Sequence, residues 1–364
     1  MAARVPPAWV VRPLLAFRNG VARIHRGMVP PFVPLFERSL GMIDTKTVSV
    51  AADLGIADAL AEGPRTVIDL ATALELDADA LGRLLRFLVG RGVFKRRRDG
   101  QFANNRVSAR LRADHPESIR AWVQFCGSPW HVEMWNELEH SIRTGESGAV
   151  AAFGHDFWDY TTRENPDAGL VFDAAMEQMS RVQLEIVAAK YDWPSGARIC
   201  DVGGGTGTLL SAIVRSSSDL TGVLFDLPEV VAKAGPVLRE AGVADRVEVL
   251  GGDFFAAVPE GCDRYVLQAI VHDWDDNSCV QFLTRCREAL PLGGRVLVLD
   301  QTMPVHSGDS PAKALDLEML VDTGKGRERT RREFEALFAR AGLRIRRVIP
   351  IAITSVFELE PVSP

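Results

Sequence analysis

The sequence contains few cysteines, and they are not arranged in a way that would stabilise a small fold. Five cysteines are spread over 364 residues, and none lies in a CxxC pair or beside a histidine at zinc-site spacing. We therefore expect neither a disulfide framework nor a structural zinc site, and a reducing, cytoplasmic setting fits. No apolar run approaches the roughly 20 residues of a membrane span. Arg12 and Arg18 interrupt the apolar stretches that a signal peptide would need, so we expect a soluble protein.

An excess of basic charge is also missing, except at the N-terminus. The formal net charge of −6 argues against a protein that coats nucleic acid. Residues 1–40, in contrast, hold six arginines against one acid, Glu37. Apolar residues lie between these arginines, which predicts a short basic amphipathic helix followed by the proline-rich turn MVPPFVP. This arm, residues 1–44, can rest on an anionic membrane surface, but we favour packing against a second subunit with the arginines in water.

The length and the change in periodicity indicate more than one domain. A chain of 364 residues with 47% hydrophobic content exceeds what one domain usually holds. Apolar residues follow helical spacing up to about Pro194, and short β-rich runs alternate with helical stretches after it. We assign residues 45–115 to a first domain, 116–193 to a helical connector and 194–364 to a second domain.

The first domain has the pattern of a winged helix. A helix is expected over residues 45–61, and Thr66 and Asp77 are placed to cap two further helices. Two strand-like pieces then flank Asp99 and Gly100, a strong hairpin signal. Three helices and a hairpin describe a winged helix.

Two functions are open to such a domain. The basic run Lys95 to Arg98 on the hairpin suits phosphate contacts, which raises the hypothesis of a DNA-binding regulator. The expected recognition helix, however, offers only Arg83 and Arg86 among apolar residues, and no Asn, Gln or Ser that reads base edges. We therefore favour a dimerisation module without a nucleic-acid partner.

The connector is rich in large, soft side chains. Residues 116–193 contain Trp130, Phe172 and Met176 among many other tryptophans, phenylalanines and methionines. At helical spacing such residues are most often plain core. Because the connector joins two domains, where small-molecule pockets tend to form, a role in lining a pocket is equally open.

The second domain alternates strands and helices. Strand-like runs begin at Ala197, and helical segments are expected at about 208–215, 228–241, 277–290 and 330–341. This alternation predicts an α/β fold with a parallel, doubly wound, Rossmann-like sheet. Ligands of such sheets bind at the carboxyl ends of the strands.

The first turn of this domain is rich in glycine. Gly203, Gly205 and Gly207 follow Asp201, but position 208 is threonine, so the dinucleotide fingerprint is incomplete and NAD is disfavoured. A carboxylate before the turn would repel a pyrophosphate and suits a ligand with an ammonium or sulfonium group. The glycines would let the backbone approach that ligand closely.

Two further acids follow strand ends. Asp226 closes the second strand, where a carboxylate can bind both hydroxyls of a ribose. Asp253 follows the third strand beside Phe254, and this pair can bind the amino group of an adenine and cover its face. An aspartate at a strand end is more often a cap or turn former, but three at successive strand ends favour a shared ligand.

At this point the sequence resembles a known family. The motifs DVGGGTG, FDLPEV, GDFF, VHDWDD, ALPLGGRVLVLD, DLEML and GRERT occur in the order and at the spacings of class I S-adenosylmethionine-dependent O-methyltransferases. The resemblance is to the plant caffeate and bacterial polyketide and hydroxyindole type, and it covers roughly residues 45–360. It implies a seven-stranded Rossmann-like sheet, an N-terminal winged-helix dimerisation domain and an intertwined homodimer. It also implies methyl transfer, without a metal, to a hydroxyl of a small aromatic or polyketide-like acceptor, with S-adenosylhomocysteine as the product.

The resemblance implies roles for individual residues. For the cofactor, it places Asp201, Gly203 and Gly205 around the methionine part, Asp226 and Leu227 at the ribose, and Asp253 and Phe254 at the adenine. Gln268, also on the cofactor side, stands where relatives often carry Lys or Arg. His272 matches the catalytic base, flanked by Asp300 and Glu328; the first of these is commonly Glu in plant members. The acceptor pocket is expected to contain Trp130, Phe172, Met176 and Met319.

The chemistry around His272 allows three interpretations. As a general base it would accept the proton of the acceptor hydroxyl near neutral pH, with a carboxylate orienting the ring. A metal site would need several converging ligands, and Asp275 or Asp276 is more simply explained as the N-cap of the next helix. A purely structural histidine is the third interpretation. The same scaffold can also support non-methyl chemistry such as hydroxylation or decarboxylation, and we favour methyl transfer with His272 as the base.

Overall fold

The computed structural model describes residues 8–306, 308–351 and 354–362. The chain forms two compact units, and each is described by itself. The sheet unit comprises Met1–Val21, Glu137–Phe157 and Ser180–Pro364, and the helical unit comprises Ala22–Asn136 and Trp158–Met179. The connector predicted over residues 116–193 thus contributes to both units.

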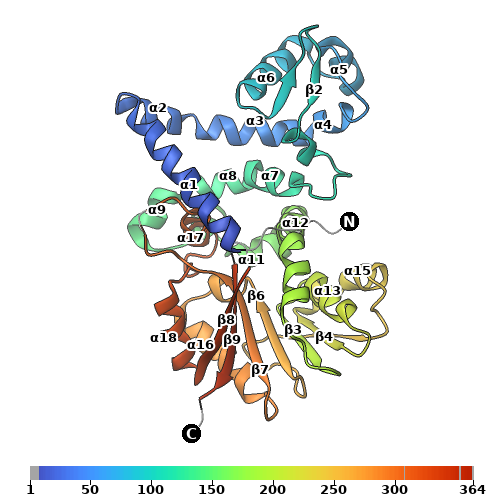
Figure 1. Cartoon of the computed structure of the whole chain (residues 1–364), viewed down its shortest axis with the longest axis vertical. Coiled ribbons are helices and arrows are strands. Elements are labelled where there is room, and N and C mark those ends of the chain that lie inside the picture. The colour runs from blue at the N-terminus through green and yellow to red at the C-terminus, as the bar shows by residue number, and fades with distance from the viewer. Residues whose placement is uncertain (1–7, 307, 352–353, 363–364) are drawn as a thin grey trace. The chain divides into compact units, whose positions relative to one another are not determined.

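The sheet unit contains a mixed sheet that is mostly parallel (Figure 1). Within the described residues the sheet has seven strands in the order β5-β4-β3-β6-β7-β9-β8. Strands β3 to β7 run parallel, and β9 pairs antiparallel with both β7 and β8. Their bounds are β3 Arg198–Val202, β4 Thr221–Asp226, β5 Val247–Gly251, β6 Arg264–Gln268, β7 Arg295–Gln301, β8 Leu343–Ile351 and β9 Thr354–Pro361. The predicted α/β class and Rossmann-like sheet are confirmed.

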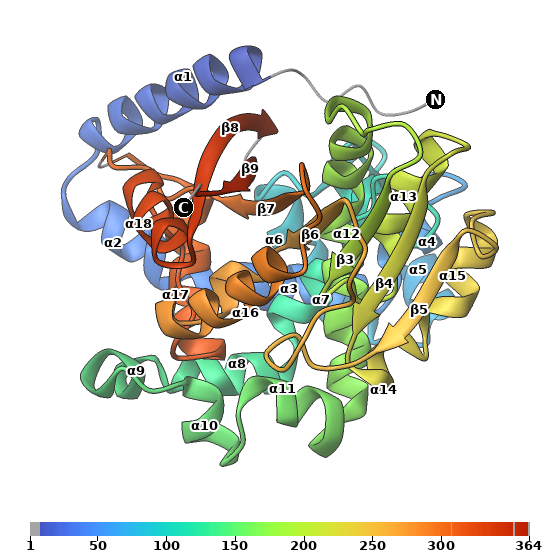
Figure 2. The same ribbon diagram turned by 90° about the horizontal axis from the view of Figure 1, so that it is seen from below.

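Helices cover both faces of this sheet. Side chains alternate between the faces along each strand, so that Ile199 packs in one core with α13 and the neighbouring Cys200 in another with α16 and α18. Figure 2 shows α16 and α18 on one side of the sheet and α13 on the other. The helices of this unit are α9 Leu138–Thr144, α10 Gly148–Phe153, α13 Thr208–Ser216, α14 Pro228–Val231, α15 Ala234–Glu240, α16 Asp276–Glu288, α17 Pro311–Asp322 and α18 Arg331–Arg340.

One predicted helix of the sheet unit is divided. The sequence predicts a helix over 228–241, whereas the structure has α14 and α15. Pro236 has no N–H to donate to the carbonyl of Ala232, so the regular hydrogen-bond ladder is interrupted between the two helices.

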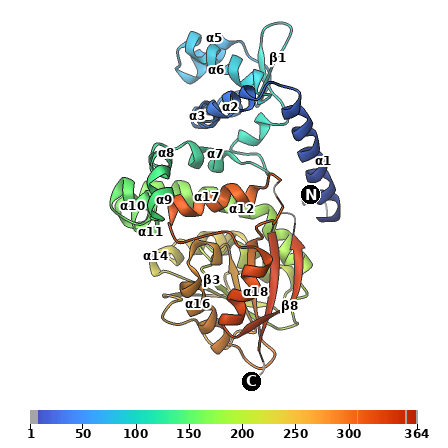
Figure 3. The same cartoon turned by 90° about the vertical axis from the view of Figure 1, so that its left-hand side faces the viewer.

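The helical unit contains a small two-stranded sheet and several helices (Figure 3). Thr66 and Asp77 cap α5 and α6 by accepting hydrogen bonds from Asp69 N and Ala80 N, as predicted. The elements are α2 Phe32–Ser39, α3 Gly41–Asp53, α4 Ile56–Ala59, α5 Val67–Leu74, α6 Ala78–Gly90, β1 Phe94–Arg96, β2 Phe102–Asn104, α7 Arg120–Gly127 and α8 Pro129–Asn136. Helices α1 Ala8–Gly27, α11 Phe157–Asp159 and α12 Pro166–Lys190 contribute to both units.

The structure differs from the prediction at two places in the N-terminal part. The helix expected over 45–61 is divided into α3 and α4, because Gly55 between them adopts a left-handed φ of 63°. The amphipathic helix expected in the arm is α1, but the proline-rich turn is short, since α2 begins at Phe32. Pro34 lies in the first turn of α2, where a missing N–H costs no helical hydrogen bond. Among the helices of the described residues, none has the length and apolar character to cross a membrane.

Candidate active site

His272 lies on a short 3-10 turn beyond the strand that was expected to carry it. The sequence predicts that the apolar half of LQAIVHDWDD is a strand, but β6 ends at Gln268. Ala269 adopts a φ of 52°, unusual for a residue with a side chain, and turns the chain away from the sheet. Its N–H still donates to Leu299 O over 3.0 Å. The 3-10 turn Val271–Asp273 then presents His272 at the carboxyl edge of the sheet.

Three carboxylates surround the imidazole of His272. Its Nδ1 lies 3.0 Å from Glu328 Oε1 and 3.8 Å from Asp300 Oδ1. The two acids expected to flank His272 are therefore beside it, and only Glu328 is within hydrogen-bond distance. Asp300, one methylene shorter, does not reach. On the other side of the ring, Asp273 Oδ1 lies 3.5 Å from Nε2.

Asp273 is a residue that sequence reasoning missed. The acids after His272 were assigned to the start of the next helix, and this is correct for Asp275, which caps α16 by accepting hydrogen bonds from Asn277 N and Ser278 N. Asp273 is instead buried beside the ring. The sequence could have indicated Asp273 because this residue directly follows His272, and a tight turn brings adjacent side chains close together.

The carboxylates change the protonation of His272. Burial alone would lower the pKa of the imidazole, but the charges of Asp273 and Asp300 and the hydrogen bond that Nδ1 donates to Glu328 together raise this pKa to about 10. Burial raises the pKa of Asp300 to about 7 and that of Asp273 to about 6, against the opposing effect of His272. The imidazolium and the carboxylates thus stabilise each other's charged forms.

Two of these carboxylates have oxygens without a hydrogen-bond donor in the part of the chain that the structure describes. Both side-chain oxygens of Asp300 and Oε2 of Glu328 are buried without a hydrogen-bond partner within the described residues. The negative charge is therefore compensated mainly by His272 itself. The imidazole of His272, surrounded by these acids, can bind and release a proton.

A second group of acids lies at the glycine turn after β3. Asp201 is buried, and its Oδ2 has no hydrogen-bond partner within the described residues. Burial, with a smaller contribution from the charge of Asp226, raises the pKa of Asp201 to about 7. Asp226 accepts hydrogen bonds from Gly205 N over 2.8 Å and from Leu227 N over 2.7 Å. A carboxylate can accept more than two hydrogen bonds in all.

The glycine turn is shaped to receive a ligand. Gly203 has a φ of 70°, and a Cβ there would lie 2.5 Å from Ile270 Cδ1 and 3.8 Å from Phe254 Cε1. A Cβ on Gly205 would meet nothing within 4 Å, so the backbone of this residue is openly accessible. The structure thus brings Phe254 next to Gly203, as a shared cofactor site requires, and adds Ile270, which the sequence did not indicate.

The other residues expected to bind the cofactor lie at the ends of strands β5 and β6. Asp253 follows β5, and its Oδ1 accepts a hydrogen bond from Phe255 N over 2.8 Å. The ring of Phe254 packs against those of Phe255 and Phe282 at centroid distances of 4.9 and 5.3 Å. Gln268 ends β6 and is half-buried. A cationic ligand with an adenosine part fits this edge of the sheet. The features that suit it are the unpaired carboxylate oxygen of Asp201, the uncrowded backbone of Gly205 and the ring of Phe254.

The residues expected in the acceptor pocket are divided between the units. Met319 lies on α17 of the sheet unit and is buried. In the helical unit, Phe125 packs against Trp130 and Phe172 at centroid distances of 5.5 and 5.7 Å. Met176 is half-buried on α12. Trp130 and Phe172 therefore belong to one aromatic cluster.

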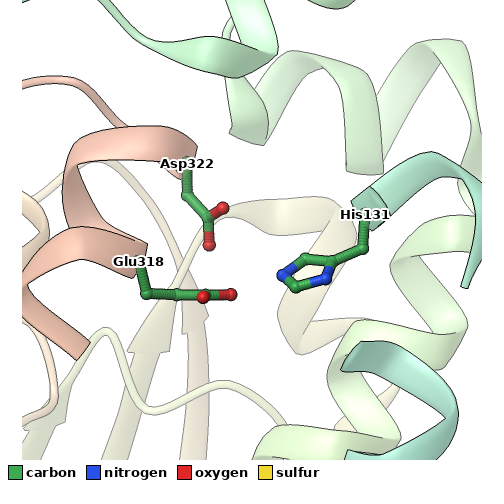
Figure 4. A group of neighbouring side chains, drawn as sticks. All are labelled: His131, Glu318 and Asp322. Atoms are coloured by element: carbon green, nitrogen blue, oxygen red, sulfur yellow. The ribbon is translucent and has the colours of Figure 1, made fainter. Parts of the chain in front are cut away.

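Helix α17 carries two more acids that sequence reasoning did not single out. Glu318 and Asp322 are four residues apart, and Figure 4 shows both carboxylates on the same side of the helix. His131, the third residue labelled there, belongs to α8 of the helical unit. Burial raises the pKa of Asp322 well above its usual value, and the charges of Glu318 and Asp273 add to this. The acidic character of the His272 site thus extends to α17.

Comparison with protein families matches two ranges that together cover most of the chain. Residues 135–344 match an O-methyltransferase domain, and residues 36–114 match an O-methyltransferase dimerisation domain. The first match includes both groups of acids described above. The second match covers α3 to α6 and the hairpin of β1 and β2.

Characterised relatives are similar over most of their length. Phenazine O-methyltransferase PhzM of Lysobacter antibioticus is 37% identical over 339 residues, 92% of this chain and 98% of that protein. The mitomycin biosynthesis 6-O-methyltransferase of Streptomyces lavendulae is 39% identical, over 85% of this chain and 88% of that protein.

Solved structures of relatives share the fold, and one of them contains bound ligands. The structure of LaPhzM has a TM-score of 0.85 at 37% identity and covers 92% of this chain and 100% of that chain. An O-methyltransferase from neocarzinostatin biosynthesis, solved with S-adenosylmethionine and 2-hydroxy-5-methyl naphthoic acid, has a TM-score of 0.75 at 36% identity, with 87% and 96% covered. The protein therefore belongs to the S-adenosylmethionine-dependent O-methyltransferases with an N-terminal dimerisation domain.

Proposed function

We propose that this enzyme methylates a hydroxyl group of a small aromatic or polyketide-like acceptor, and that His272 accepts the hydroxyl proton. The observation that carries this proposal is the contact between His272 Nδ1 and the buried carboxylate of Glu328. The acceptors named for the relatives support the acceptor class, since they include a phenazine and 2,7-dihydroxy-5-methyl-1-naphthoate. Methyl transfer is accordingly favoured over the non-methyl and regulatory alternatives.

The hydrogen bond to Glu328 gives His272 an orientation suited to a base. When Nδ1 donates to the carboxylate, the neutral ring carries its lone pair on Nε2. The carboxylates then stabilise the imidazolium that forms when Nε2 takes up the hydroxyl proton. Because the pKa of His272 is raised to about 10, the neutral form that accepts a proton increases as the pH rises. A cation bound nearby would disfavour the imidazolium and increase this form further.

For the cofactor we assign roles that follow the order of the strands. S-adenosylmethionine, when bound, supplies a methyl group already activated on a sulfonium. Asp201 with the backbone of Gly203 and Gly205 would bind its methionine part, and Asp226 with Leu227 its ribose. Asp253, Phe254 and Gln268 would bind the adenine. The orphan oxygen of Asp201 and the open backbone of Gly205 support these roles.

We assign Trp130, Phe172, Met176 and Met319 to the acceptor site. All four are half-buried or buried, largely apolar groups that suit a flat, apolar molecule. The aromatic cluster around Phe125 provides ring faces and edges for such an acceptor.

The assembly we propose is a homodimer formed through the helical unit. The match to a dimerisation domain supports it, as do apolar side chains of α2 that are strongly exposed, such as Phe32 at 68% and Leu35 at 72%. We interpret α4 to α6 with β1 and β2 as a winged helix that serves pairing and not DNA binding. The free cysteines support a reducing, cytoplasmic location.

A panel of acceptors tests the function. Purified protein is incubated with S-adenosylmethionine carrying a deuterated methyl group and with phenols, hydroxynaphthoates and hydroxyphenazines. Mass spectrometry should show one labelled methyl on a hydroxyl oxygen of at least one acceptor, and none on the matched methyl ether. Transfer only to aliphatic alcohols or to nitrogen would contradict the proposed acceptor class.

A further inference from the structure

The segment from Gly326 to Arg329 contacts the turn that carries His272 at several points. Arg327 N donates a hydrogen bond of 2.7 Å to His272 O. The side chain of Glu328 binds the ring of the same histidine. A Cβ on Gly326 would lie 2.5 Å from His272 O, so only glycine allows this close approach. The backbone and the ring of His272 are thus held by one short stretch of chain.

Arg329 binds the backbone on both sides of His272. Its Nη1 donates to Val271 O over 2.7 Å, and its Nη2 donates to Trp274 O over 2.8 Å. Val271 directly precedes His272, and Trp274 ends the 3-10 turn. A planar guanidinium holds two carbonyls in a fixed geometry with separate nitrogens, whereas the single rotatable ammonium of a lysine does not fix them in this way. Consecutive side chains, Glu328 and Arg329, therefore hold the ring and the backbone of the turn.

The charge of Arg329 is buried but paired. The side chain is 1% exposed, and Nε and Nη2 lie 2.9 and 2.8 Å from Asp276 Oδ1. Asp276 opens α16, and its side chain is 44% exposed. A buried cation is stable only with such partners. The guanidinium therefore connects the His272 turn to the start of a helix packed in the sheet core.

We infer that Arg329 is a positioning residue for methyl transfer, which fixes the 3-10 turn so that His272 stays aligned with Glu328 and Asp300. This inference rests on the proposed role of His272 as the base. The shortest hydrogen bonds of Arg329 go to Val271, Trp274 and Asp276 and not to a side-chain nitrogen of His272. Its effect on the reaction is exerted through the backbone on either side of His272. An arginine that only stabilised the fold would change stability without changing the titration of His272.

Arg329→Lys tests this inference in the full-length enzyme. We expect kcat to fall on the order of ten- to a hundredfold, because small misplacements of a catalytic group have effects of this size. The KM for S-adenosylmethionine should change little. The ascending limb of the pH profile should move to lower pH, because His272 loses alignment with the carboxylates that raise its pKa. Asp276→Asn, which removes only the charge of the partly exposed partner of Nε and Nη2, should produce the same changes to a smaller extent.

Arg246→Lys is the matched control. Arg246 Nη1 donates to Val214 O, Ser217 O and Leu220 O at 2.9, 2.8 and 3.2 Å, so it also holds backbone carbonyls, but away from His272. This variant should lose thermal stability and keep the kcat and pH profile of the native enzyme. An equal loss of kcat in Arg246→Lys would overturn the inference. So would a native kcat and pH profile in both Arg329→Lys and Asp276→Asn.

A double variant separates this inference from the proposed role of His272. If Arg329 acts through His272, Arg329→Lys should lower kcat little further in an enzyme that already carries His272→Ala. Full turnover of His272→Ala alone would remove His272 as the base. A loss from Arg329→Lys that is as large in the His272→Ala background as in the native one would instead refute the action of Arg329 through that histidine.

Discussion

The two groups of carboxylates in the sheet unit compensate their buried negative charge in different ways. Around His272, the acids Asp273, Asp300 and Glu328 face an imidazole that they keep protonated. At the glycine turn, backbone N–H groups hold Asp226, while Asp201 has a buried oxygen without a partner. The first group therefore contains its own cation, whereas the buried oxygen of Asp201 has no hydrogen-bond partner among the described residues. This difference supports the proposal that the first group moves a proton and the second binds a charge.

The largest effect should come from removing the imidazole. His272→Ala leaves the three carboxylates without their cation and the acceptor without a base, so we expect kcat to fall by about 10²–10⁴-fold. Cofactor affinity, measured by calorimetry, should be nearly unchanged because the glycine turn is intact. His140→Ala is the control, since its partly exposed ring lies 3.3 Å from a different acid, Glu146. Native turnover of a folded His272→Ala enzyme would remove the contrast between the two groups.

Glu328→Gln tests whether the charge of Glu328 controls the protonation of His272 in the first group. The amide keeps the size and an oxygen for the Nδ1 proton but removes the negative charge that favours the imidazolium. The pKa of His272 should therefore fall from about 10. Since turnover needs the neutral ring, the rise of kcat with pH should occur at lower pH than in the native enzyme, while the plateau decreases about tenfold or more.

The matched control for this variant is Glu335→Gln. Glu335 forms an exposed pair with Arg331 on α18, so the pH profile should stay native. A rise of kcat at unchanged or higher pH in Glu328→Gln would show that Glu328 does not set the titration of His272.

The features predicted from sequence are those with a local signal. Thr66, Asp77 and Asp275 cap helices because their side chains reach N–H groups two or three residues ahead. The order of strands and helices follows from hydrophobic spacing. The positions of Asp300 and Glu328 beside His272 came from family resemblance, because the two ends of the contact between His272 and Glu328 are 56 residues apart.

Other features of the site had no local signal at all. The left-handed φ of Ala269 is not marked by a glycine or asparagine. The contacts of Arg329 join residues more than fifty positions apart. Such contacts depend on tertiary packing, which the periodicity of a single sequence does not contain.

Asp201→Asn should show that the second group is built to bind a charge. Without the carboxylate, a cationic ligand loses a charge-assisted contact of about 1.5–3 kcal/mol, so cofactor affinity should fall on the order of ten- to a hundredfold. The folded protein should nevertheless become more stable at pH 8. Burial raises the pKa of Asp201 to about 7, so its ionised form destabilises the folded state there, and an amide has no such cost. We expect an increase in Tm of about a few degrees.

Asp219→Asn is the control for this pair of effects. Asp219 accepts hydrogen bonds from Ser195, Gly196 and Ser217, and these bonds lower its pKa to about 2. Its replacement should lower Tm and leave cofactor affinity unchanged. An Asp201→Asn enzyme that binds the cofactor as well as the native enzyme would show that the orphan carboxylate does not face a cation.

The smallest effect should be the pH dependence of cofactor binding in the native enzyme. The pKa of Asp201 is raised to about 7 by burial and by Asp226, and only the ionised carboxylate attracts a cation. As the pH falls from 8 to 6 this carboxylate becomes protonated, so the measured affinity should decrease by about tenfold. Calorimetry across this range would test the sign, and Asp201→Asn should remove the dependence. If the affinity instead increased toward pH 6, a group other than Asp201 would control the pH dependence of cofactor binding. The two groups of carboxylates would then differ in their position on the sheet and not in how their charge is compensated.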